Sequence, residues 1–281
     1  MKFADLHLHT LYSDGTYSPE SLVHEAVNSG FSCIAVVDHD TVEGVEETIQ
    51  AGLKVGLEVL SGIELTAEYD GVEVHLLGYF IDHRSLLLKE ELLRLKKIRV
   101  ERVYKIIERL KVMGVSLKAH TVFELGGKGT VGRLHIARAM VKEGIVSTTA
   151  EAFANFIGDN CPAYVCGFRF TPQEAIALIK NVGGLAVLAH PYSLHRDALI
   201  PELVKSGLLG LEVYYPEHTQ STINFYSQIA RQYNLLVTGG SDCHGTAKPE
   251  VRLGMIKLPY DYVEILKEKH LSIIDHKVNE K

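Results

Sequence analysis

Asp5-Leu6-His7-Leu8-His9, near the start of the chain, alternates polar and apolar residues with a period of two. Residues two apart on a β-strand point to the same face, so this period predicts a strand with His7 and His9 side by side. Two such histidines lie roughly 6.5 to 7 Å apart at the backbone, and their rings can converge on one cation. A strand can also carry two histidines by chance, so the rest of the chain has to decide.

Length and composition are those of an ordinary globular protein. The 281 residues are 46% hydrophobic and 23% charged, which predicts one large domain or one domain with an insertion. The net charge of −6 argues against broad binding to duplex nucleic acid. No apolar run reaches the roughly 18 residues needed to cross a membrane, and no signal peptide is evident, so we expect a cytoplasmic location. The four cysteines do not have the spacing of a disulfide framework.

Strand-like runs alternate with helix-like stretches along most of the chain, which predicts an α/β architecture with parallel strands. The predicted strands are Phe3–His9, Cys33–Asp38, Glu58–Glu64, Leu185–His190, Gly210–Tyr214 and Leu235–Ser241, with a hairpin over Leu65–Ile81. The predicted helices are Pro19–Ser29, Thr41–Gly52, Pro172–Asn181, Asp197–Ser206 and His218–Tyr233. Asp70-Gly71 is expected to be the hairpin turn, and Ser18 the N-cap of the first helix.

The stretch from Arg84 to Cys161 breaks this alternation and reads as successive helices. These are Leu87–Met113, Ala119–Glu124, Leu134–Glu143 and Thr149–Phe156. We interpret residues 84–161 as an all-helical insertion between two halves of a barrel or sheet. The run Gly126-Gly127-Lys128-Gly129 is glycine-rich like a phosphate loop, but it lacks the first glycine and the Ser or Thr after the lysine that a P-loop requires.

Metal-ligating side chains recur where predicted strands end. They are His7 and His9, Asp14, Asp38-His39-Asp40, Glu64, His75, His190, Glu212, and Asp242 with His244. Each has an ordinary explanation by itself; Asp38 could be a helix N-cap, and Glu212 could face solvent on an edge strand. The joint pattern is harder to reach by chance, because such groups are costly to bury unless paired or metal-bound. In a (β/α) barrel, the carboxyl ends of the strands form the active site.

Together these motifs resemble the PHP family, the polymerase and histidinol phosphatase superfamily of metal-dependent phosphoesterases. The match is carried by Asp5–Thr10, Ser13–Gly15, Asp38–Asp40, Glu64, His75, His190-Pro191 and Ser241–His244, and it runs to about residue 255. The resemblance implies a distorted (β/α)7 barrel with an all-helical insertion. Residues 1–83 and 162–281 would form the catalytic barrel, and residues 84–161 would cap its active site.

The same resemblance implies three metal positions. His7, His9, Glu64 and Asp242 would form one, and Glu64, His75 and His190 a second that shares Glu64. Asp14, His39 and His244 would form a third, where some family members have histidine in place of Asp14. This departure, with the helical insertion, is more similar to the branch that acts on nucleoside phosphates. Asp5 has no ligand assignment and is expected to be a structural carboxylate or one that orients a ligating histidine.

The chemistry implied by this site is hydrolysis of a phosphate ester. Two cations sharing Glu64 would bridge a water and supply hydroxide near neutral pH, so His7, His9, Glu64 and Asp242 would be catalytic through this metal-bridged hydroxide. Mixed histidine and carboxylate ligands suit Mn, Zn or Fe better than Mg, with two or three ions per chain. By the resemblance, Arg133 and His135 would bind substrate, although Arg133 could equally be a surface charge. Lys128, Arg169 and Arg196 are weaker candidates.

We therefore expect a phosphoesterase for small phosphorylated substrates, without partners among long duplex nucleic acids or membranes. Candidate substrates are 3′,5′-nucleoside bisphosphates, nucleoside monophosphates and the 5′ ends of short RNA, degraded in the 5′-3′ direction. A histidinol-phosphatase-like enzyme is the first alternative. An amidohydrolase-type enzyme is another, but it needs a bridging lysine and no lysine ends a predicted strand. A non-catalytic metal-binding module would lack ligands, and none of the expected ligands is missing.

Overall fold

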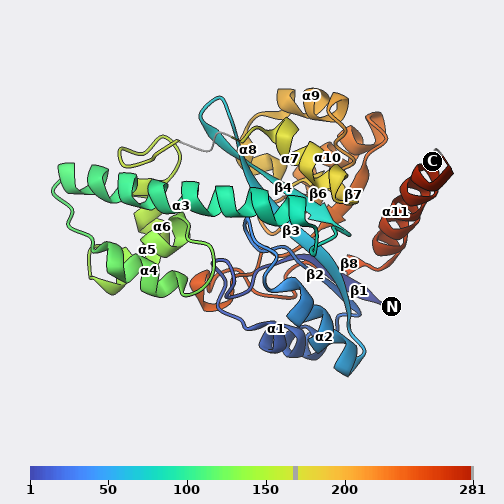
Figure 1. The fold of residues 1–281 in the computed structure, drawn as a ribbon, viewed down its shortest axis with the longest axis horizontal. Helices are drawn as coiled ribbons and strands as arrows, with labels where there is room; N and C mark the ends of the chain where they lie inside the picture. The colour runs from blue at the N-terminus through green and yellow to red at the C-terminus, as the bar shows by residue number, and fades with distance from the viewer. Residues whose placement is uncertain (167–169, 280–281) are drawn as a thin grey trace.

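A single eight-stranded sheet forms the barrel of the computed structural model, which describes residues 1–166 and 170–279 (Figure 1). The strands are β1 (Phe3–Leu8), β2 (Cys33–Val36), β3 (Glu58–Tyr69), β4 (Val72–Tyr79), β5 (Leu185–Leu188), β6 (Gly210–Tyr214), β7 (Leu236–Gly239) and β8 (Leu258–Pro259). They follow the order β7-β6-β5-β4-β3-β2-β1-β8. The segment after β7 returns to β1, where Asp242 N donates to His7 O at 2.9 Å and His9 N to Cys243 O at 3.2 Å. The barrel is therefore nearly closed, and the predicted fold class is confirmed.

The sheet is mixed rather than wholly parallel. β1, β2 and β3 run parallel, as do β5, β6 and β7, but β4 is antiparallel to both of its neighbours. The predicted hairpin joins β3 to β4, and Asp70 and Gly71 form its turn with φ of 51° and 78°, the conformation that a two-residue hairpin of type I′ requires. The prediction that a strand ends at Glu64 is wrong, because β3 continues through Tyr69 to build this hairpin.

Helices cover the barrel and form a separate layer beside it. They are α1 (Pro19–Asn28), α2 (Val45–Val55), α3 (Leu86–Val112), α4 (Ala119–Gly126), α5 (Arg133–Lys142), α6 (Thr149–Ala152), α7 (Pro172–Asn181), α8 (Pro191–Leu194), α9 (Ile200–Lys205), α10 (Gln220–Gln232) and α11 (Asp261–Asn279). A short π-helix, η1 (Phe153–Ile157), follows α6. Two short 3-10 helices are η2 (Asp197–Leu199) and η3 (Gly245–Ala247). No helix in the described ranges is both long and apolar enough to cross a bilayer.

Local sequence explains where several helices begin. Ser18 caps α1 as predicted, since its side chain accepts a hydrogen bond from Ser21 N. The predicted helix over 197–206 is instead a 3-10 turn followed by α9, because Pro201 fits only the first turn of an α-helix. The predicted start of α2 at Thr41 is wrong by four residues, and the helix begins after Gly44. The terminal helix α11 was not predicted.

The long helix α3 connects the barrel to the helical layer, as Figure 1 shows. Leu88 and Leu95, near its start, pack in the barrel core. Val103 and Ile106, about two to three turns after Leu95, pack in a second core formed with α4, α5 and η1. The two cores therefore share one continuous helix, which fixes the helical layer against the open end of the barrel.

A buried ion pair joins α3 to the barrel. Arg99 donates from Nε to Asp40 Oδ2 at 2.6 Å, from one terminal nitrogen to Thr66 Oγ1 at 2.6 Å, and from the other to Val131 O at 3.2 Å. We expect Arg99→Ala to lower the free energy of unfolding by about 3–5 kcal/mol, because it leaves Asp40 charged and buried. Arg94→Ala, which removes an exposed pair with Glu91 and a contact of the guanidinium with the Phe170 ring, should cost less, about 1 kcal/mol. Equal denaturation midpoints for the two variants would contradict this account.

Candidate metal centre

Glu64 lies at the centre of the predicted ligand set, inside the open end of the barrel. Its Oε2 atom is 3.1 Å from His7 Nε2, 3.2 Å from His9 Nε2 and 3.3 Å from His39 Nδ1. Its Oε1 atom is 2.9 Å from His75 Nδ1 and 3.3 Å from His190 Nε2. β1, β3 and β4 and the segments after β2 and β5 thus bring five imidazoles to one buried carboxylate.

Three overlapping groups of side chains have the geometry to hold a cation. They are His7, His9, Glu64 and Asp242; His39, Glu64 and His75; and His9, Asp14, His39 and His244. Within each group the ligand atoms lie within 4.8 Å of one another. The first group is the set that the resemblance implies. The second group has His39 beside the Glu64 and His75 that the resemblance implies, and the third group has His9 beside Asp14, His39 and His244. His190 is not in the second group, but its Nε2 atom lies 3.3 Å from Glu64 Oε1. All nine predicted ligands are therefore brought together.

Several of these ligand atoms are buried without a well-aligned hydrogen bond, although each lies within 3.3 Å of an atom of another ligand. They are His9 Nε2, Asp14 Oδ1, His39 Nδ1, His75 Nδ1 and His244 Nε2. Burying a polar atom without a partner is costly, and native structures rarely tolerate it. Divalent cations would satisfy these nitrogen and oxygen atoms together. The residues present therefore fit the divalent metals that the family implies.

Local electrostatics keep the ligands in states that can bind a cation. Burial alone would raise the pKa of Glu64, but the neighbouring imidazoles of His39, His7 and His75 hold it well below its usual range. Burial lowers the pKa of His39 well below its usual range and also lowers that of His244, so both rings are neutral and keep a lone pair. The His244 Nδ1–H donates to Asp242 O at 2.7 Å, which leaves Nε2 facing Asp14 at 3.1 Å.

Three other rings, those of His7, His9 and His75, have the opposite shift. Burial would lower the pKa of both His9 and His75. Hydrogen bonds and charges from Asp242 and Glu64 instead raise the pKa of His9 to about 9. Charges and hydrogen bonds from Glu64 and Glu73 raise the pKa of His75 to about 10. Both rings are therefore protonated at neutral pH when no cation is bound. A cation has to displace these protons, so cation affinity increases with pH.

Glu212 supports the site from beneath, and its role was not predicted. It is fully buried on β6; Oε1 is 2.9 Å from His7 Nδ1, and Oε2 accepts from His190 N at 2.8 Å. The carboxylate holds His7 with Nε2 turned toward Glu64 and Asp242. The alternative that Glu212 faces solvent is therefore wrong. Its position in the apolar run Leu211-Glu212-Val213 was the available signal.

We expect Glu212→Gln to weaken cation binding by roughly 10- to 100-fold, as is typical for residues that orient a metal-ligating histidine. Equilibrium dialysis against Mn would measure the loss. Glu217→Gln is the matched control, because Glu217 lies in the loop after the same strand and lines the cavity, whereas the carboxylates beside His7 are those of Glu64, Glu212 and Asp242. Unchanged affinity in Glu212→Gln would show that His7 keeps its orientation without this carboxylate.

Two more carboxylates fix the backbone around the ligands. Asp5 Oδ1 accepts from Ser241 N at 2.9 Å and His7 N at 3.3 Å, so it joins β1 to the segment after β7. Asp5 therefore binds backbone amides, as expected for a structural carboxylate. Asp38 accepts from Thr10 N at 2.7 Å and Ser13 Oγ at 2.5 Å. It therefore holds the loop that carries Asp14.

A cavity of about 210 Å³ opens above the ligands and is roofed by the helical layer. Arg133 on α5 lines it, donating to Glu73 Oε2 at 2.7 Å and to Asp159 Oδ1 at 2.6 Å. Arg102 also lines it and pairs with Glu73. The guanidinium groups of Arg133 and Arg102, from the helical layer, therefore face the ligand cluster of the barrel across this cavity.

Lys248 and Tyr215 line the same cavity and were not predicted. Lys248 Nζ is 3.1 Å from Asp242 Oδ2, and the Tyr215 hydroxyl donates to the same oxygen at 2.9 Å. Only Oδ1 of Asp242 is then left to face His9 at 3.0 Å and His7 at 3.4 Å. These contacts fix which oxygen of the carboxylate is available to a cation.

The other predicted substrate-binding residues lie elsewhere. His135 is buried, accepts from Gly132 N through Nδ1 at 3.2 Å, and does not line the cavity. Burial lowers the pKa of His135 to about 4, so the ring is neutral. Lys128 lines a different cavity, and Arg196 lies beside η2. Arg169 lies outside the described residues.

Comparison with known proteins places the chain in a family. The PHP domain matches residues 5–125. A 5′-3′ exoribonuclease of Haemophilus influenzae is 31% identical over 245 residues, covering 85% of this chain and 89% of that protein. The chain belongs to the PHP family. Its predicted membership is confirmed, and with it the prediction of a metal-dependent hydrolase of phosphoester bonds.

Other PHP relatives differ in their named substrates. A phosphoribosyl 1,2-cyclic phosphate 1,2-diphosphodiesterase of Eggerthella lenta is 31% identical, covering 86% of this chain and 94% of that protein. A 3′,5′-nucleoside bisphosphate phosphatase of Chromobacterium violaceum is 29% identical, covering 85% and 86%. A crystal structure from Bifidobacterium adolescentis, assigned as a metal-dependent phosphoesterase, superposes with a TM-score of 0.87 at 32% identity, covering 94% of this chain and 95% of that one.

Proposed function

We propose that this PHP enzyme hydrolyses phosphate esters of nucleotides, including 3′,5′-nucleoside bisphosphates, nucleoside monophosphates and the 5′ ends of short RNA. The observation that carries the proposal is the position of Arg133, which faces a cluster of nine histidine and carboxylate ligands across one cavity, with Lys248 beside Asp242 on the side of the cluster. A phosphate group in that cavity meets cationic side chains on one side and the ligand cluster on the other. The exoribonuclease and bisphosphate phosphatase named above support this substrate class.

Each part of the cavity has a distinct task in this proposal. Divalent cations, two or three per chain and Mn, Zn or Fe by the mixed ligand set, would supply a hydroxide nucleophile near neutral pH and neutralise phosphate charge. His7, His9, Glu64 and Asp242 would hold them, and Glu64 faces both neighbouring positions. Arg133 orients the phosphate through its planar guanidinium. Lys248 neutralises Asp242 Oδ2 and adds a positive charge at the rim of the cavity.

The size of the cavity limits what reaches the centre. At about 210 Å³ it is smaller than the roughly 300–1,000 Å³ of typical small-molecule sites. It accommodates a phosphate group with part of a nucleoside, and a duplex does not fit. We therefore assign the terminal phosphate of a nucleotide or a short strand as the group that is cleaved.

A substrate panel tests this proposal. The Mn-loaded protein would be assayed against 3′-AMP, 5′-AMP, 3′,5′-bisphosphoadenosine, histidinol phosphate and a short 5′-phosphorylated RNA. We expect release of phosphate or nucleotide from the nucleotide substrates. Preferred hydrolysis of histidinol phosphate would support the histidinol-phosphatase-like alternative. No turnover of any of the five, with bound metal verified, would refute the proposal.

Arg133→Ala separates two ways in which the arginine could act. If Arg133 binds phosphate equally in the ground state and the transition state, KM increases and kcat is unchanged; if it acts mainly in the transition state, kcat decreases. Because Glu73 and Asp159 already hold the guanidinium in place, we expect the first result, with KM raised roughly 10- to 100-fold for loss of a charged hydrogen bond of about 1.5–3 kcal/mol. Asp159→Asn is the control and should change KM less. Unaltered kinetics in Arg133→Ala would remove the residue from the substrate site.

A further inference from the structure

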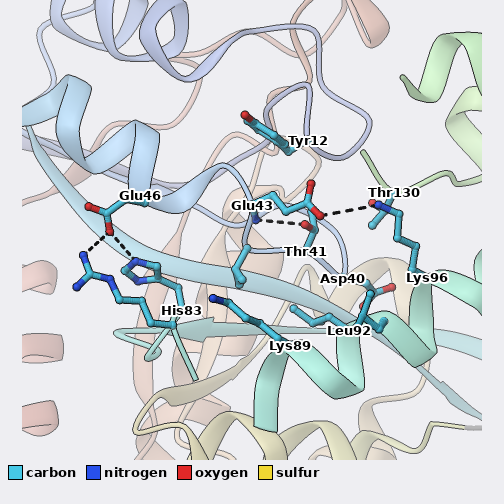
Figure 2. Close-up of a pocket in the computed structure, with 13 residues that line it drawn as sticks. Tyr12, Asp40, Thr41, Glu43, Glu46, His83, Lys89, Leu92, Lys96 and Thr130 are labelled. Carbon is cyan, nitrogen blue, oxygen red and sulfur yellow. Dashed lines mark hydrogen bonds and ion pairs between the residues drawn. The ribbon is translucent and has the colours of Figure 1, made fainter. Parts of the chain in front are cut away.

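Two larger cavities lie beside the metal centre, and Tyr12 lines both of them. One has a volume of about 860 Å³ and is formed by Tyr12, the segment Asp40–Glu46 and the first half of α3 (Figure 2). The other has a volume of about 530 Å³ and is formed by Tyr12, Thr16, the glycine-rich run and Arg138. Each is larger than the cavity above the ligands. Both lie where the barrel meets the helical insertion.

The pair of cavities adjoins the metal centre directly. Tyr12 is two residues before Asp14, in the loop that Asp38 holds. Asp40, which follows His39, lines the larger cavity together with Thr130. The Thr130 hydroxyl donates to His39 O at 2.7 Å. The metal centre and the larger cavity therefore share one wall, formed by the His39–Asp40 segment and Thr130.

The helical insertion lines the two cavities with cationic side chains. Lys89 and Lys96 on α3 face the larger one, and Lys128 and Arg138 face the smaller one. Among the residues that the structure describes, the side chains of Lys89, Lys128 and Arg138 have no hydrogen bond or ion pair. Lys96 donates to Lys128 O at 3.2 Å, so the two cationic groups meet at this contact.

The acidic residues around the larger cavity already have partners. Glu46 pairs with His83 at 2.9 Å and Arg84 at 2.8 Å, as Figure 2 shows. Glu43 lies 3.9 Å from Lys96. The larger cavity is lined by three carboxylates (Asp40, Glu43, Glu46) and three cationic side chains (Arg84, Lys89, Lys96), so the excess positive charge of the junction is that of Lys128 and Arg138 at the smaller cavity. This excess favours an anionic ligand that extends from the larger cavity to the smaller one.

Tyr12 adds an aromatic ring between the two cationic groups. Its hydroxyl donates to Glu47 Oε2 at 2.9 Å, which holds the half-exposed ring in place. On the other side of the larger cavity, α3 contributes Leu92 and Leu93, and the Leu93 side chain is 62% exposed. A flat aromatic ring with the exposed Leu93 side chain opposite offers a stacking position for a planar base.

The glycine-rich run has a role here that is not that of a P-loop. A Cβ at Gly129 would collide with Tyr12 O, and Thr130 N donates to that same oxygen at 3.0 Å. Close backbone packing therefore requires glycine at position 129. It places Lys128 beside the loop that carries Tyr12.

We propose that this junction binds the nucleotides of a single-stranded RNA substrate that follow the terminal one at the metal centre. Sequence-independent binding of single strands combines a cationic groove with aromatic side chains on which bases stack, and both are present here. The inference rests on the proposed function, because it takes the metal centre as the place where the terminal phosphate is cleaved. It assigns Tyr12 to base stacking, and Lys89, Lys128 and Arg138 to the phosphates.

The test compares binding of a short strand with binding of a single nucleotide. The probes are a 5′-phosphorylated hexa-adenylate with phosphorothioate linkages, which resists hydrolysis, and 5′-AMP, each bound to the Mn-loaded protein. We expect the hexamer to bind at least roughly tenfold more tightly, from stacking of one or more bases. Tyr12→Ala should weaken hexamer binding about 5- to 100-fold, and Tyr12→Phe should restore it. AMP binding should be the same in all three proteins.

The lysines are tested by salt dependence. Lys89→Ala and Lys128→Ala should each reduce the slope of log affinity against log salt by about 0.7, the value for one phosphate contact on a single strand. Lys205→Ala on α9, which removes an exposed lysine far from both cavities, should leave the slope unchanged.

The outcomes separate this inference from the proposed function. A hexamer that binds no more tightly than AMP would overturn the RNA site, even if the enzyme hydrolyses nucleotides. So would a salt slope that none of the lysine substitutions changes. Hexamer binding that depends on Tyr12 and Lys89, in a protein that hydrolyses none of the panel, would retain the RNA site and refute the proposed function.

Discussion

Asp242→Asn is expected to lower kcat at least roughly a thousandfold. Oδ1 of Asp242 faces His9 at 3.0 Å and His7 at 3.4 Å, and Oδ2 is held by Lys248 and Tyr215. Asparagine keeps the shape of the side chain but removes the charge that a cation requires. A bound cation stabilises the transition state by several kcal/mol, and each 1.36 kcal/mol corresponds to a factor of ten in rate.

The measurement is kcat at saturating Mn, with the Mn content of the protein determined in parallel. Asp261→Asn is the matched control, because Asp261 is exposed at the start of α11. It should retain both activity and metal. His9→Ala should behave like Asp242→Asn while the circular dichroism spectrum stays native. Full activity in either site variant would show that the catalytic centre lies elsewhere.

Glu64→Gln is expected to have the broadest effect on metal binding. The Glu64 carboxylate is within 3.3 Å of five histidine rings and belongs to two of the three ligand groups. Its loss should release more than one cation per chain and abolish detectable turnover. A cation at 100 times its dissociation constant stabilises a folded protein by about 2.7 kcal/mol. Mn should therefore raise the Tm of the unsubstituted protein, and the rise should be largely lost in Glu64→Gln.

Glu58→Gln provides the comparison for this experiment. Glu58 lies on the same strand, but it pairs with Lys267 and accepts from the Tyr260 hydroxyl, away from the ligand cluster. Its substitution should lower the Tm of the metal-free protein slightly and leave the Mn-induced rise intact. If Glu64→Gln kept the same Mn-induced rise, the bridging position of Glu64 would be wrong.

The clustering of several candidate ligands could be predicted from local pattern. His7 and His9 alternate with leucines at the end of β1, and His39, His190 and Asp242 follow β2, β5 and β7, so topology brings them to one end of the barrel. The supporting residues could not be predicted in this way. The contact between His7 and Glu212 joins residues 205 positions apart, and neither position has a local signal that names its partner.

The continuity of β3 and two loop conformations were also beyond local pattern. The sequence predicts a strand over Glu58–Glu64 and a separate hairpin from Leu65, but these residues form one strand that pairs with β4 through Tyr69. Asp242 and His190 adopt positive φ values of 56° and 26°. Such backbone conformations are unfavourable for these residues and are held by the surrounding contacts, so the sequence gives little indication of them.

A titration of the metal-free protein with Mn, followed by phosphate release from 3′,5′-bisphosphoadenosine, tests the central claim most directly. Glu64 lies between overlapping ligand groups, so hydrolysis should require that neighbouring positions are filled together. We predict little activity up to one equivalent of bound Mn per chain and a steep rise as the second binds. Full activity at one equivalent or fewer would contradict a polynuclear centre.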